Sequence, residues 1–419
     1  MSNKIQIEGG NTLSGKINIS GAKNAVLALL PATILSEGDT KIFNVPNISD
    51  TEAIMDIVKY LGGTISCEKD VIKVNTKNLI NKEIPEKMSS KLRASYYFMS
   101  ALLGRFKHVE MYFPGGCSIG ARPIDQTLKG YKALGATVTE KNTKYIIDAT
   151  ELHGAHIYLD MPSVGATVNT MLVAVRAKGV TTIENAAREP EIVNLAIFLN
   201  NMGANIKGAG TSAIKITGVD TLSGCFGEVI PDRIEAGTYV IAGALMGDNL
   251  KIDNIIPEHI ETLTSKLGEM GVPLKIEESS ITVSKPDKYE PVKVKTLGYP
   301  GFATDLQQPL TALLTQCNGI SYLEETIYEN RFKNVKYLNN MGANIKINKA
   351  GNKIIIKGPS KLKGKNVMAT DLRAGACMVL AALKASGKTT INEIEHVLRG
   401  YEDLVGKLSS VGAKIKLIK

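Results

Sequence analysis

The most distinctive chemical setting in the sequence belongs to Cys117, at the centre of the segment PGGCSIGARPIDQ (residues 114–126). Two glycines precede Cys117, and Arg122 follows five residues later. A nearby guanidinium stabilises a thiolate, whereas an anionic ligand raises the thiol pKa again. This setting favours a chemical role for Cys117, as a general acid or as a nucleophile. We interpret the other four cysteines as packing or surface thiols: Cys67, Cys225, Cys317 and Cys377.

A second segment whose residues could bind a ligand is SGAKNAVLALL. Lys23 and Asn24 begin an apolar helix there, directly after a turn of small residues. A helix start offers N–H groups and a positive dipole end, which suit a phosphate or a carboxylate. Alternatively, Ser20 caps the helix and Lys23 is solvated. Arg93 occupies the same position in the following part of the chain, which favours anion binding.

Two later helix starts carry the tripeptide TDL, so Asp305 and Asp371 are both candidate N-caps. We interpret Asp371 as structural. Asp305 follows the glycine-rich segment GYPGFA, so a role toward substrate stays open.

Arginines recur in the loops that follow the predicted strands, where several could converge on one ligand. Their forked side chains bind phosphate and carboxylate through two hydrogen bonds. Any one of them alone is better explained as a surface ion-pair partner, and the recurrence in equivalent loops is what favours a shared ligand. The loop arginines are Arg122, Arg188, Arg331 and Arg399, with Arg373 at a helix start.

A repeat of about seventy residues must position these side chains. Its signature is an apolar residue, a glycine, a small or apolar residue and a strand-like segment. The signature recurs six times, at spacings of 73, 68, 68, 71 and 70 residues. Each repeat begins with an apolar helix, which we expect to be buried on most sides. A short strand, an amphipathic helix that ends near the signature glycine, and closing strands follow.

Six such repeats are too large for one hydrophobic core, so we predict two α/β domains of three repeats each. The first comprises residues 22–230 and carries the Cys117 loop. The second is discontinuous, residues 1–21 plus 231–419, because the opening strand IQIEGGNTLSGKINI should pair beside the final KIKLIK. We expect the active site in the cleft between the domains, where ligands often bind.

The second repeat departs from the others in the segment that contains Cys117. From the middle of the first strand to the signature glycine, five repeats need 19 to 21 residues, and the second needs 24, from Met111 to Gly135. Because the sister repeats pack without this insertion, it indicates a functional loop, such as a lid.

Composition narrows the functional classes. The net charge of +9 favours anionic partners. Five cysteines without a C-x-x-C spacing argue against a disulfide framework or a zinc site and fit a reducing cytoplasm. The N-terminus lacks the apolar stretch of a signal peptide, and apolar runs such as AVLALLPATIL are too short to span a bilayer. The absence of tryptophan and 5% aromatic residues argue against a stacking surface for single-stranded nucleic acid.

The motifs, taken together and in order, resemble a known family along essentially the whole chain. SGAKNA, PGGCSIGARPID, SVGATVN, PDRIEAGTY, GFATDLQQP, ENRF, DLRAGA and HVLRGYEDLVGKL are similar to the UDP-N-acetylglucosamine 1-carboxyvinyltransferases, which belong to the enolpyruvyl transferases. The resemblance implies an inside-out α/β barrel fold of two threefold domains. It also implies transfer of the enolpyruvyl group of phosphoenolpyruvate to UDP-N-acetylglucosamine, the first committed step of peptidoglycan synthesis.

The resemblance also implies the roles of individual residues. Cys117 would protonate the methylene carbon of phosphoenolpyruvate, and fosfomycin would alkylate its thiol. Asp305 would accept the proton of the sugar 3'-hydroxyl. Lys23, Arg122 and Arg399 would hold the phosphate, and Arg331 and Arg373 the carboxylate. The UDP-sugar site would be lined by Asn24, Arg93, Arg122, Pro123, Ile124, Asp125, Gln126, Ser163, Val164, Gly165, Asp305 and Ile327.

One segment departs from the family pattern, because residues 160–162 are Asp160, Met161 and Pro162, where some members carry a lysine that reaches toward the nucleotide. We expect no metal, no cofactor, no nucleic acid, no membrane, and a cytoplasmic monomer or weak homo-oligomer. The nearest alternative is the sister enzyme that uses shikimate 3-phosphate. An alternative of another class is a basic ring that encircles DNA, although the clustered loop residues would have no purpose in such a clamp.

Overall fold

The computed structural model describes residues 3–115 and 123–418. The chain forms two compact units. Of the described residues, 21–115 and 123–230 form unit 2, and 3–20 and 231–418 form unit 1. Each unit has its own cluster of buried apolar side chains. The reason is the repeat: three repeats supply enough apolar surface for one core, and six would exceed it.

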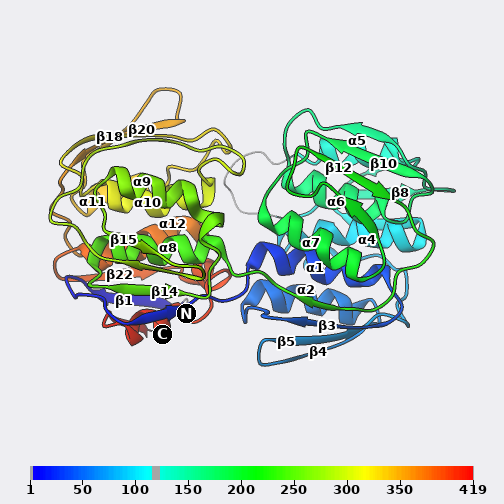
Figure 1. The fold of residues 1–419 in the computed structure, drawn as a ribbon, viewed down its shortest axis with the longest axis horizontal. Coiled ribbons are helices and arrows are strands. Elements are labelled where there is room, and N and C mark those ends of the chain that lie inside the picture. Colours follow the sequence, from blue (N-terminus) through cyan, green and yellow to red (C-terminus); the bar gives the residue numbers. More distant parts are fainter. Residues whose placement is uncertain (1–2, 116–122, 419) are drawn as a thin grey trace. The chain divides into compact units, whose positions relative to one another are not determined.

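Three apolar helices form the centre of each unit, and sheets cover them (Figure 1). In unit 1 all three central helices contact one another; in unit 2, α4 contacts both α1 and α6. These helices carry few charges and are buried along nearly their whole length, as the sequence predicted. They are α1 (Lys23–Ala32), α4 (Tyr97–Phe106) and α6 (Val164–Ala174) in unit 2, and α8 (Arg233–Met246), α10 (Thr304–Leu314) and α12 (Leu372–Lys384) in unit 1.

The strands of unit 2 form three sheets, each with alternating buried and exposed residues, so one face meets the helices and the other meets water. The orders are β13-β3-β5-β4, β6-β8-β7 and β11-β12-β10-β9. The bounds are β3 (Asp39–Phe43), β4 (Thr64–Glu68), β5 (Val71–Asn75), β6 (His108–Tyr112), β7 (Thr137–Lys141), β8 (Lys144–Asp148), β9 (His156–Tyr158), β10 (Val180–Glu184), β11 (Asn205–Lys207), β12 (Ala213–Thr217) and β13 (Phe226–Glu228).

Unit 1 has three sheets of the same kind, ordered β15-β16-β14-β2, β17-β18-β20-β19 and β21-β22-β1-β23. The bounds are β1 (Lys4–Glu8), β2 (Lys16–Asn18), β14 (Leu250–Asp253), β15 (Leu274–Ile276), β16 (Ser280–Val283), β17 (Lys293–Lys295), β18 (Gly319–Glu324), β19 (Ile345–Ile347), β20 (Lys353–Gly358), β21 (Asn366–Met368), β22 (Lys388–Asn392) and β23 (Lys414–Ile418).

The remaining helices connect the strands. Each repeat has a second helix before its signature glycine: α2 (Ser49–Tyr60), α5 (Asp125–Ala133), α7 (Pro190–Asn201), α9 (Glu261–Glu269), α11 (Val335–Asn340) and α14 (Leu404–Ser410). Shorter helical turns are α3 (Glu86–Ser89), α13 (Glu395–Leu398), η1 (Thr33–Leu35), η2 (Arg93–Tyr96) and η3 (Pro257–Ile260).

The signature glycines have one structural reason. All six adopt positive φ, between 80° and 108°, just after the second helix of their repeat: Gly62, Gly135, Gly203, Gly271, Gly342 and Gly412. This left-handed conformation terminates the helix and turns the chain into the next strand, and only glycine adopts it without cost. The repeated glycine in the sequence therefore corresponds to six equivalent helix ends in the structure.

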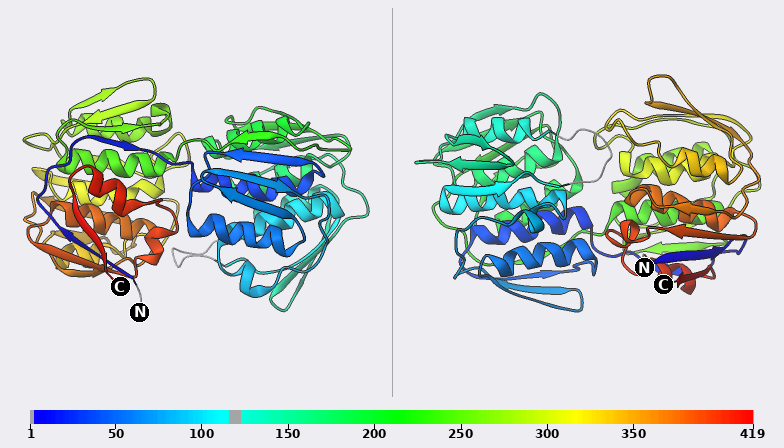
Figure 2. Two further views of the ribbon diagram at one scale, coloured as in Figure 1. Left: turned by 90° about the horizontal axis from the view of Figure 1, so that it is seen from below. Right: turned by 180° about the vertical axis from the view of Figure 1, so that it is seen from behind.

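The opening strand pairs with the last strand, as predicted, because β1 is antiparallel to β23 with Ile5 opposite Leu417. β1 and β23 accordingly lie side by side in unit 1 (Figure 2). The prediction of a single opening strand was wrong. Residues 16–18 form a separate strand, β2, which pairs in parallel with β14 in another sheet. Gly10 and Gly15, both at positive φ, lie between the two strands.

Candidate active site

In unit 2, Lys23 lies at the start of α1, and its ammonium is held by a carboxylate from the next helix. Lys23 Nζ is 2.7 Å from Asp50 Oδ2, and only 12% and 7% of the two side chains are exposed. An ion pair buried to this extent fixes the position of the ammonium. Asn24 follows and is exposed. Ser20 does not cap this helix, because the N-cap is Ala22 and Ser20 Oγ accepts a hydrogen bond from Lys407 Nζ.

A second group of predicted residues in unit 2 gathers around Tyr96. The guanidinium carbon of Arg93 lies 5.5 Å from the centre of the Tyr96 ring. A Cβ at Gly165 would overlap the Tyr96 hydroxyl, so only glycine allows the start of α6 to approach this ring. Ser163 caps α6, since its Oγ accepts from Ala166 N at 3.2 Å, and Val164 is the first helical residue. Arg93 and residues 163–165 therefore lie in one region.

The described end of the inserted loop leads into α5. Pro123 is exposed, Ile124 is buried, and Asp125 begins the helix. Gln126 Nε2 donates to Asp160 Oδ2 at 2.9 Å, and Gln126 Oε1 accepts from Asp160 N at 2.9 Å. Cys117 and Arg122, two central residues of the predicted site, lie outside the described residues.

Asp160, the first residue of the departing segment 160–162, is thus held by side chains of α5. Lys129 Nζ lies 2.8 Å from its second carboxylate oxygen. These contacts hold the pKa of Asp160 below its usual range, through the hydrogen bonds from Lys129 and then Gln126.

In unit 1, a carboxylate and two guanidiniums form a cluster at the starts of α10 and α12. Arg331 Nη2 donates to Asp305 Oδ1, and Arg373 Nη2 donates to Asp305 Oδ2 at 3.0 Å. Asp305 is the second residue of α10, whose N-cap is Ala303. The reading of Asp305 as an N-cap was therefore wrong, because its carboxylate is bound to the two arginines. Asp371 does cap α12, accepting from the backbone N–H groups of Arg373 and Ala374 at 3.0 Å.

The burial of this cluster is uneven. The side chains of Arg331 and Arg373 are 3% and 4% exposed, whereas 27% of the Asp305 side chain is exposed. Burial alone would raise the pKa of Asp305, but the charges of Arg373 and Arg331 and their hydrogen bonds hold it well below its usual range. Two guanidiniums and one carboxylate leave the cluster with one net positive charge, which suits a further anion.

Several residues that sequence reasoning missed hold these arginines in place. Gln308 Nε2 donates to the backbone carbonyl of Arg331 at 2.9 Å. Tyr328 and Tyr401 present ring faces 5.1 and 5.6 Å from the guanidinium carbons of Arg331 and Arg373. A signal was present for the tyrosines, since each lies within a segment that also contains a predicted arginine, YENR and LRGY.

The last two predicted residues of unit 1 are less buried. Arg399 is the half-buried C-cap residue of α13. Ile327 is 41% exposed, and its backbone N–H donates to Glu325 Oε1 at 2.8 Å. Arg188, in an equivalent loop of unit 2, is exposed.

The cysteines in the described residues fit the interpretation as packing or surface thiols. Cys317 and Cys377 are buried, and Cys67 is exposed. Burial raises the pKa of Cys225 and Cys317 to about 11 and that of Cys377 to about 12. These three thiols stay protonated at neutral pH and are poor nucleophiles.

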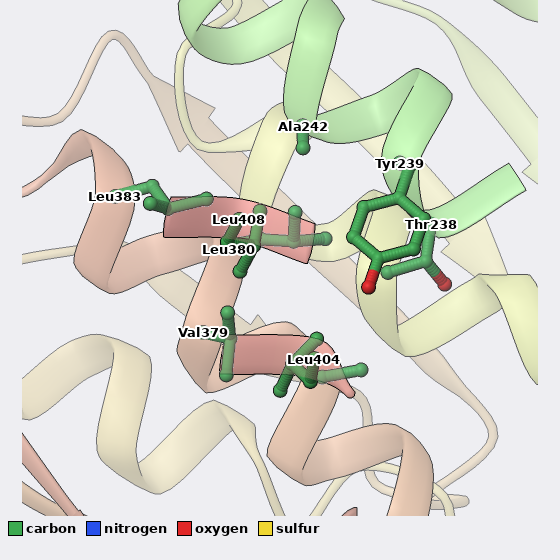
Figure 3. Close-up of a pocket in the computed structure, with 9 residues that line it drawn as sticks. Thr238, Tyr239, Ala242, Val379, Leu380, Leu383, Leu404 and Leu408 are labelled. Atoms are coloured by element: carbon green, nitrogen blue, oxygen red, sulfur yellow. The ribbon is translucent and has the colours of Figure 1, made fainter. Parts of the chain in front are cut away.

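A small pocket inside unit 1 is separate from these polar clusters. Figure 3 shows it lined mainly by aliphatic side chains of α8, α12 and α14, with Thr238 and Tyr239 at one side. Thr238 Oγ1 is 2.9 Å from the Tyr401 hydroxyl, which links the pocket wall to the Arg373 surroundings. Its lining contains none of the predicted site residues, so it is part of the core.

Within residues 3–115 and 123–418, no three His, Cys, Asp or Glu side chains are placed to share a metal ion. The helices in that part of the chain are all too short or too polar to cross a bilayer.

Comparison with solved structures gives the class of protein. The fold is similar to the enolpyruvyl transferase NikO from Streptomyces tendae, with a TM-score of 0.90 and 26% identity over 100% of this chain and 99% of that chain. It also matches EPSP synthase from Acinetobacter baumannii, with a TM-score of 0.76 and 17% identity over 100% of both chains. The fold is that of the enolpyruvyl transferases, which confirms the predicted fold class.

Comparison of sequences narrows the class. The family profile of EPSP synthase (3-phosphoshikimate 1-carboxyvinyltransferase) matches residues 7–408. UDP-N-acetylglucosamine 1-carboxyvinyltransferase 2 of Listeria monocytogenes is 50% identical over 99% of this chain and 98% of its own length. The protein of the same name from Geobacillus kaustophilus is 52% identical over 98% of this chain and 96% of its own length. The chain belongs to the UDP-N-acetylglucosamine 1-carboxyvinyltransferases, within the EPSP synthase family.

Proposed function

We propose that this protein transfers the enolpyruvyl group of phosphoenolpyruvate to the 3'-hydroxyl of UDP-N-acetylglucosamine and releases phosphate. The observation that carries the proposal is the identity of 50% over 99% of the chain with a protein named for this reaction. The reaction is the first committed step of peptidoglycan synthesis. We place the reaction in the cytoplasm. The enzyme is proposed to be a monomer or a weak homo-oligomer.

The proposed reaction is an addition followed by an elimination. Cys117 gives a proton to the methylene carbon of phosphoenolpyruvate, and Asp305 takes the proton of the 3'-hydroxyl as its oxygen attacks the adjacent carbon. The resulting tetrahedral ketal then loses phosphate, and the methyl group returns one proton to the Cys117 thiolate, which restores the double bond and the thiol. Protonation of the enol carbon creates oxocarbenium character, which a placed acid and nearby anions stabilise.

The proposal assigns the two anionic ends of phosphoenolpyruvate to different cations. Lys23, Arg122 and Arg399 bind the phosphate, and Arg331 and Arg373 bind the carboxylate. Fixed cations of this kind orient the reacting atoms. Correct orientation can lower an activation barrier by up to roughly 7–11 kcal/mol. The ion pair between Lys23 and Asp50 supports this role, because it holds the ammonium in one position.

The nucleotide-sugar site of the proposal lies mainly on unit 2. The region around Tyr96, with Arg93 and residues 163–165, offers polar groups at a helix start. The remaining proposed members are Asn24, Arg122, Pro123, Ile124, Asp125, Gln126, Asp305 and Ile327.

Phosphate release tests the proposal directly. We expect the purified chain to release phosphate from phosphoenolpyruvate when UDP-N-acetylglucosamine is present, and to release little with either substrate alone. Shikimate 3-phosphate serves as the control acceptor, because the matching family profile is named for it. Release with shikimate 3-phosphate instead of the UDP-sugar would assign the chain to the sister activity, and release with neither acceptor would refute both.

A further inference from the structure

The two arginines that the proposed function assigns to the substrate carboxylate already bind a carboxylate of the protein. Asp305 uses one oxygen for Arg331 and the other for Arg373. The two guanidinium side chains are 3% and 4% exposed, and Asp305 is the most exposed of the three, at 27%. Asp305 is therefore the member of the cluster that an approaching anion meets first.

The two guanidiniums have side-chain contacts besides Asp305. They lie 5.1 and 5.6 Å from the ring centres of Tyr328 and Tyr401, and Arg331 Nη1 donates to Gln308 Oε1 at 3.5 Å. Within the described residues, the carboxylate of Asp305 has hydrogen bonds to the two guanidiniums alone. A rotation of its short side chain breaks both bonds at once and leaves the arginines in place. An external carboxylate can then bind with the same two-pronged geometry.

We infer that Asp305 is an exchangeable internal ligand of Arg331 and Arg373, which the carboxylate of phosphoenolpyruvate replaces, and that the released Asp305 is the base for the acceptor hydroxyl. This inference rests on the proposed function and adds the event that activates the base. No atom is lost or gained in the exchange, since one carboxylate takes the place of another and the two buried guanidiniums keep one bound carboxylate in both states.

The exchange explains how Asp305 can be both a ligand of the two arginines and the base for the acceptor hydroxyl. While it is bound to both arginines, Arg373 and Arg331 overcome the effect of burial and keep its pKa far below that of a useful base at neutral pH. Separation from two positive charges removes the interactions that stabilise its ionised form. Asp305 therefore becomes a stronger base only when phosphoenolpyruvate is in place.

The first test replaces Asp305 by the isosteric, neutral asparagine and measures ligand affinity by calorimetry without the UDP-sugar. We expect Asp305→Asn to bind phosphoenolpyruvate about tenfold more tightly, which is about 1.4 kcal/mol, because the internal competitor is weakened. Binding of inorganic phosphate, which lacks the carboxylate, should change much less. Asp287→Asn, which removes an exposed charge from the same unit, should change neither. Unchanged or weaker binding of phosphoenolpyruvate, or an equal gain for phosphate, would overturn the inference.

The second test measures the wild-type protein, and a variant is needed only to assign the signal. The carboxyl carbon of Asp305, labelled with carbon-13 and assigned with Asp305→Glu, is titrated by NMR. Phosphoenolpyruvate should raise its pKa, and inorganic phosphate should not. An unchanged pKa in a preparation that releases phosphate with both substrates would refute the exchange alone. A preparation that shows no such turnover would refute the proposed function.

Discussion

At the residue scale, the chain places its buried charges in compensating pairs. Lys23 is matched by Asp50 in unit 2, and Arg331 and Arg373 share Asp305 in unit 1. Removing one partner of a buried pair leaves the other charge uncompensated, which typically costs about 3–5 kcal/mol. The residues proposed to bind substrate are therefore also structural, and substitutions at these positions need a stability measurement beside an activity measurement.

The acid role of Cys117 makes a prediction at this scale. Cys117→Ala should fold normally and lose most turnover, because no group remains to protonate the enol carbon. Cys117→Asp, which restores an acid, should retain more activity than Cys117→Ala. Phosphate release measures both. Fosfomycin should add to Cys117 in the wild-type chain and not in either variant, as read by mass spectrometry; near-normal turnover of Cys117→Ala would remove this thiol from the mechanism.

Glu235 makes a prediction about pH. Its side chain is 3% exposed, with Oε1 2.7 Å from Lys407 Nζ, and Oε2 accepts from Ser20 N at 2.9 Å. Burial raises the pKa of Glu235 to about 7, although Lys407 opposes the shift. In the unfolded chain a glutamate titrates near 4.3. The folded state thus binds the proton more tightly, so the unfolding free energy should fall as pH rises from about 4.3 to about 7.

The expected loss from this group is about 1–3 kcal/mol across that window. Glu235→Gln should remove this part of the slope, whereas Glu258→Gln, at an exposed position, should keep it. Urea denaturation at pH 5 and pH 8 measures the difference. Equal slopes for the wild type and Glu235→Gln would show that Glu235 stays ionised throughout.

At the element scale, the signature glycine of each repeat ends the second helix at the same position of the repeat. Six amphipathic helices end at a glycine with positive φ, and each apolar helix packs in the centre of its unit. The second repeat differs in its sheet, which has three strands, with a parallel bridge between Ile84 and Met111 in place of the fourth. The repeat that carries the inserted loop is therefore also the one with the reduced sheet.

The glycine argument can be tested with a matched pair. Gly203 has a φ of 105°, and a Cβ there would meet nothing within 4 Å, so Gly203→Ala should cost about 1–2 kcal/mol through backbone conformation alone. Gly268 lies within α9, and a Cβ there would also meet nothing within 4 Å. Gly268→Ala should stabilise the chain by about 0.4–1 kcal/mol. Chemical denaturation measures both, and effects of the same sign would contradict the explanation.

At the scale of the whole molecule, the N-terminal segment completes unit 1. β1 lies between β22 and β23 as an interior strand, and Ile5 and Ile7 are fully buried. The next strand, β2, belongs to a different sheet of the same unit. Unit 2, in contrast, contains none of the first twenty residues and has a separate core. The two units should therefore respond differently to changes in the first twenty residues.

We expect Ile7→Ala to destabilise unit 1 by about 2–5 kcal/mol, since it removes a buried side chain from an interior strand. Gln6→Ala, on the other face of β1, should cost less than about 0.5 kcal/mol. Amide hydrogen exchange should become faster in β22 and α12 and stay unchanged in α6 of unit 2. Equal acceleration in both units would show that they unfold as one.

Six repeats, the order of helices and strands within a repeat, and the family could be predicted from the sequence. The elements depend on local signals, namely hydrophobic period, turn glycines and contiguous motifs, and the repeats on the recurrence of one such signal about every seventy residues. It also identified Asp305, Arg331 and Arg373 as candidates one at a time.

How such residues combine depends on contacts between distant parts of the folded chain. Asp305 binds partners 26 and 68 positions away, Lys23 pairs with Asp50, and the opening segment divides between two sheets. A carboxylate that precedes a helix turn has the same local sequence whether it caps that helix or binds a distant arginine. Which of the two partners the carboxylate binds depends on the side chains that folding brings within about 3 Å of it. The local sequence does not show which distant side chains these are.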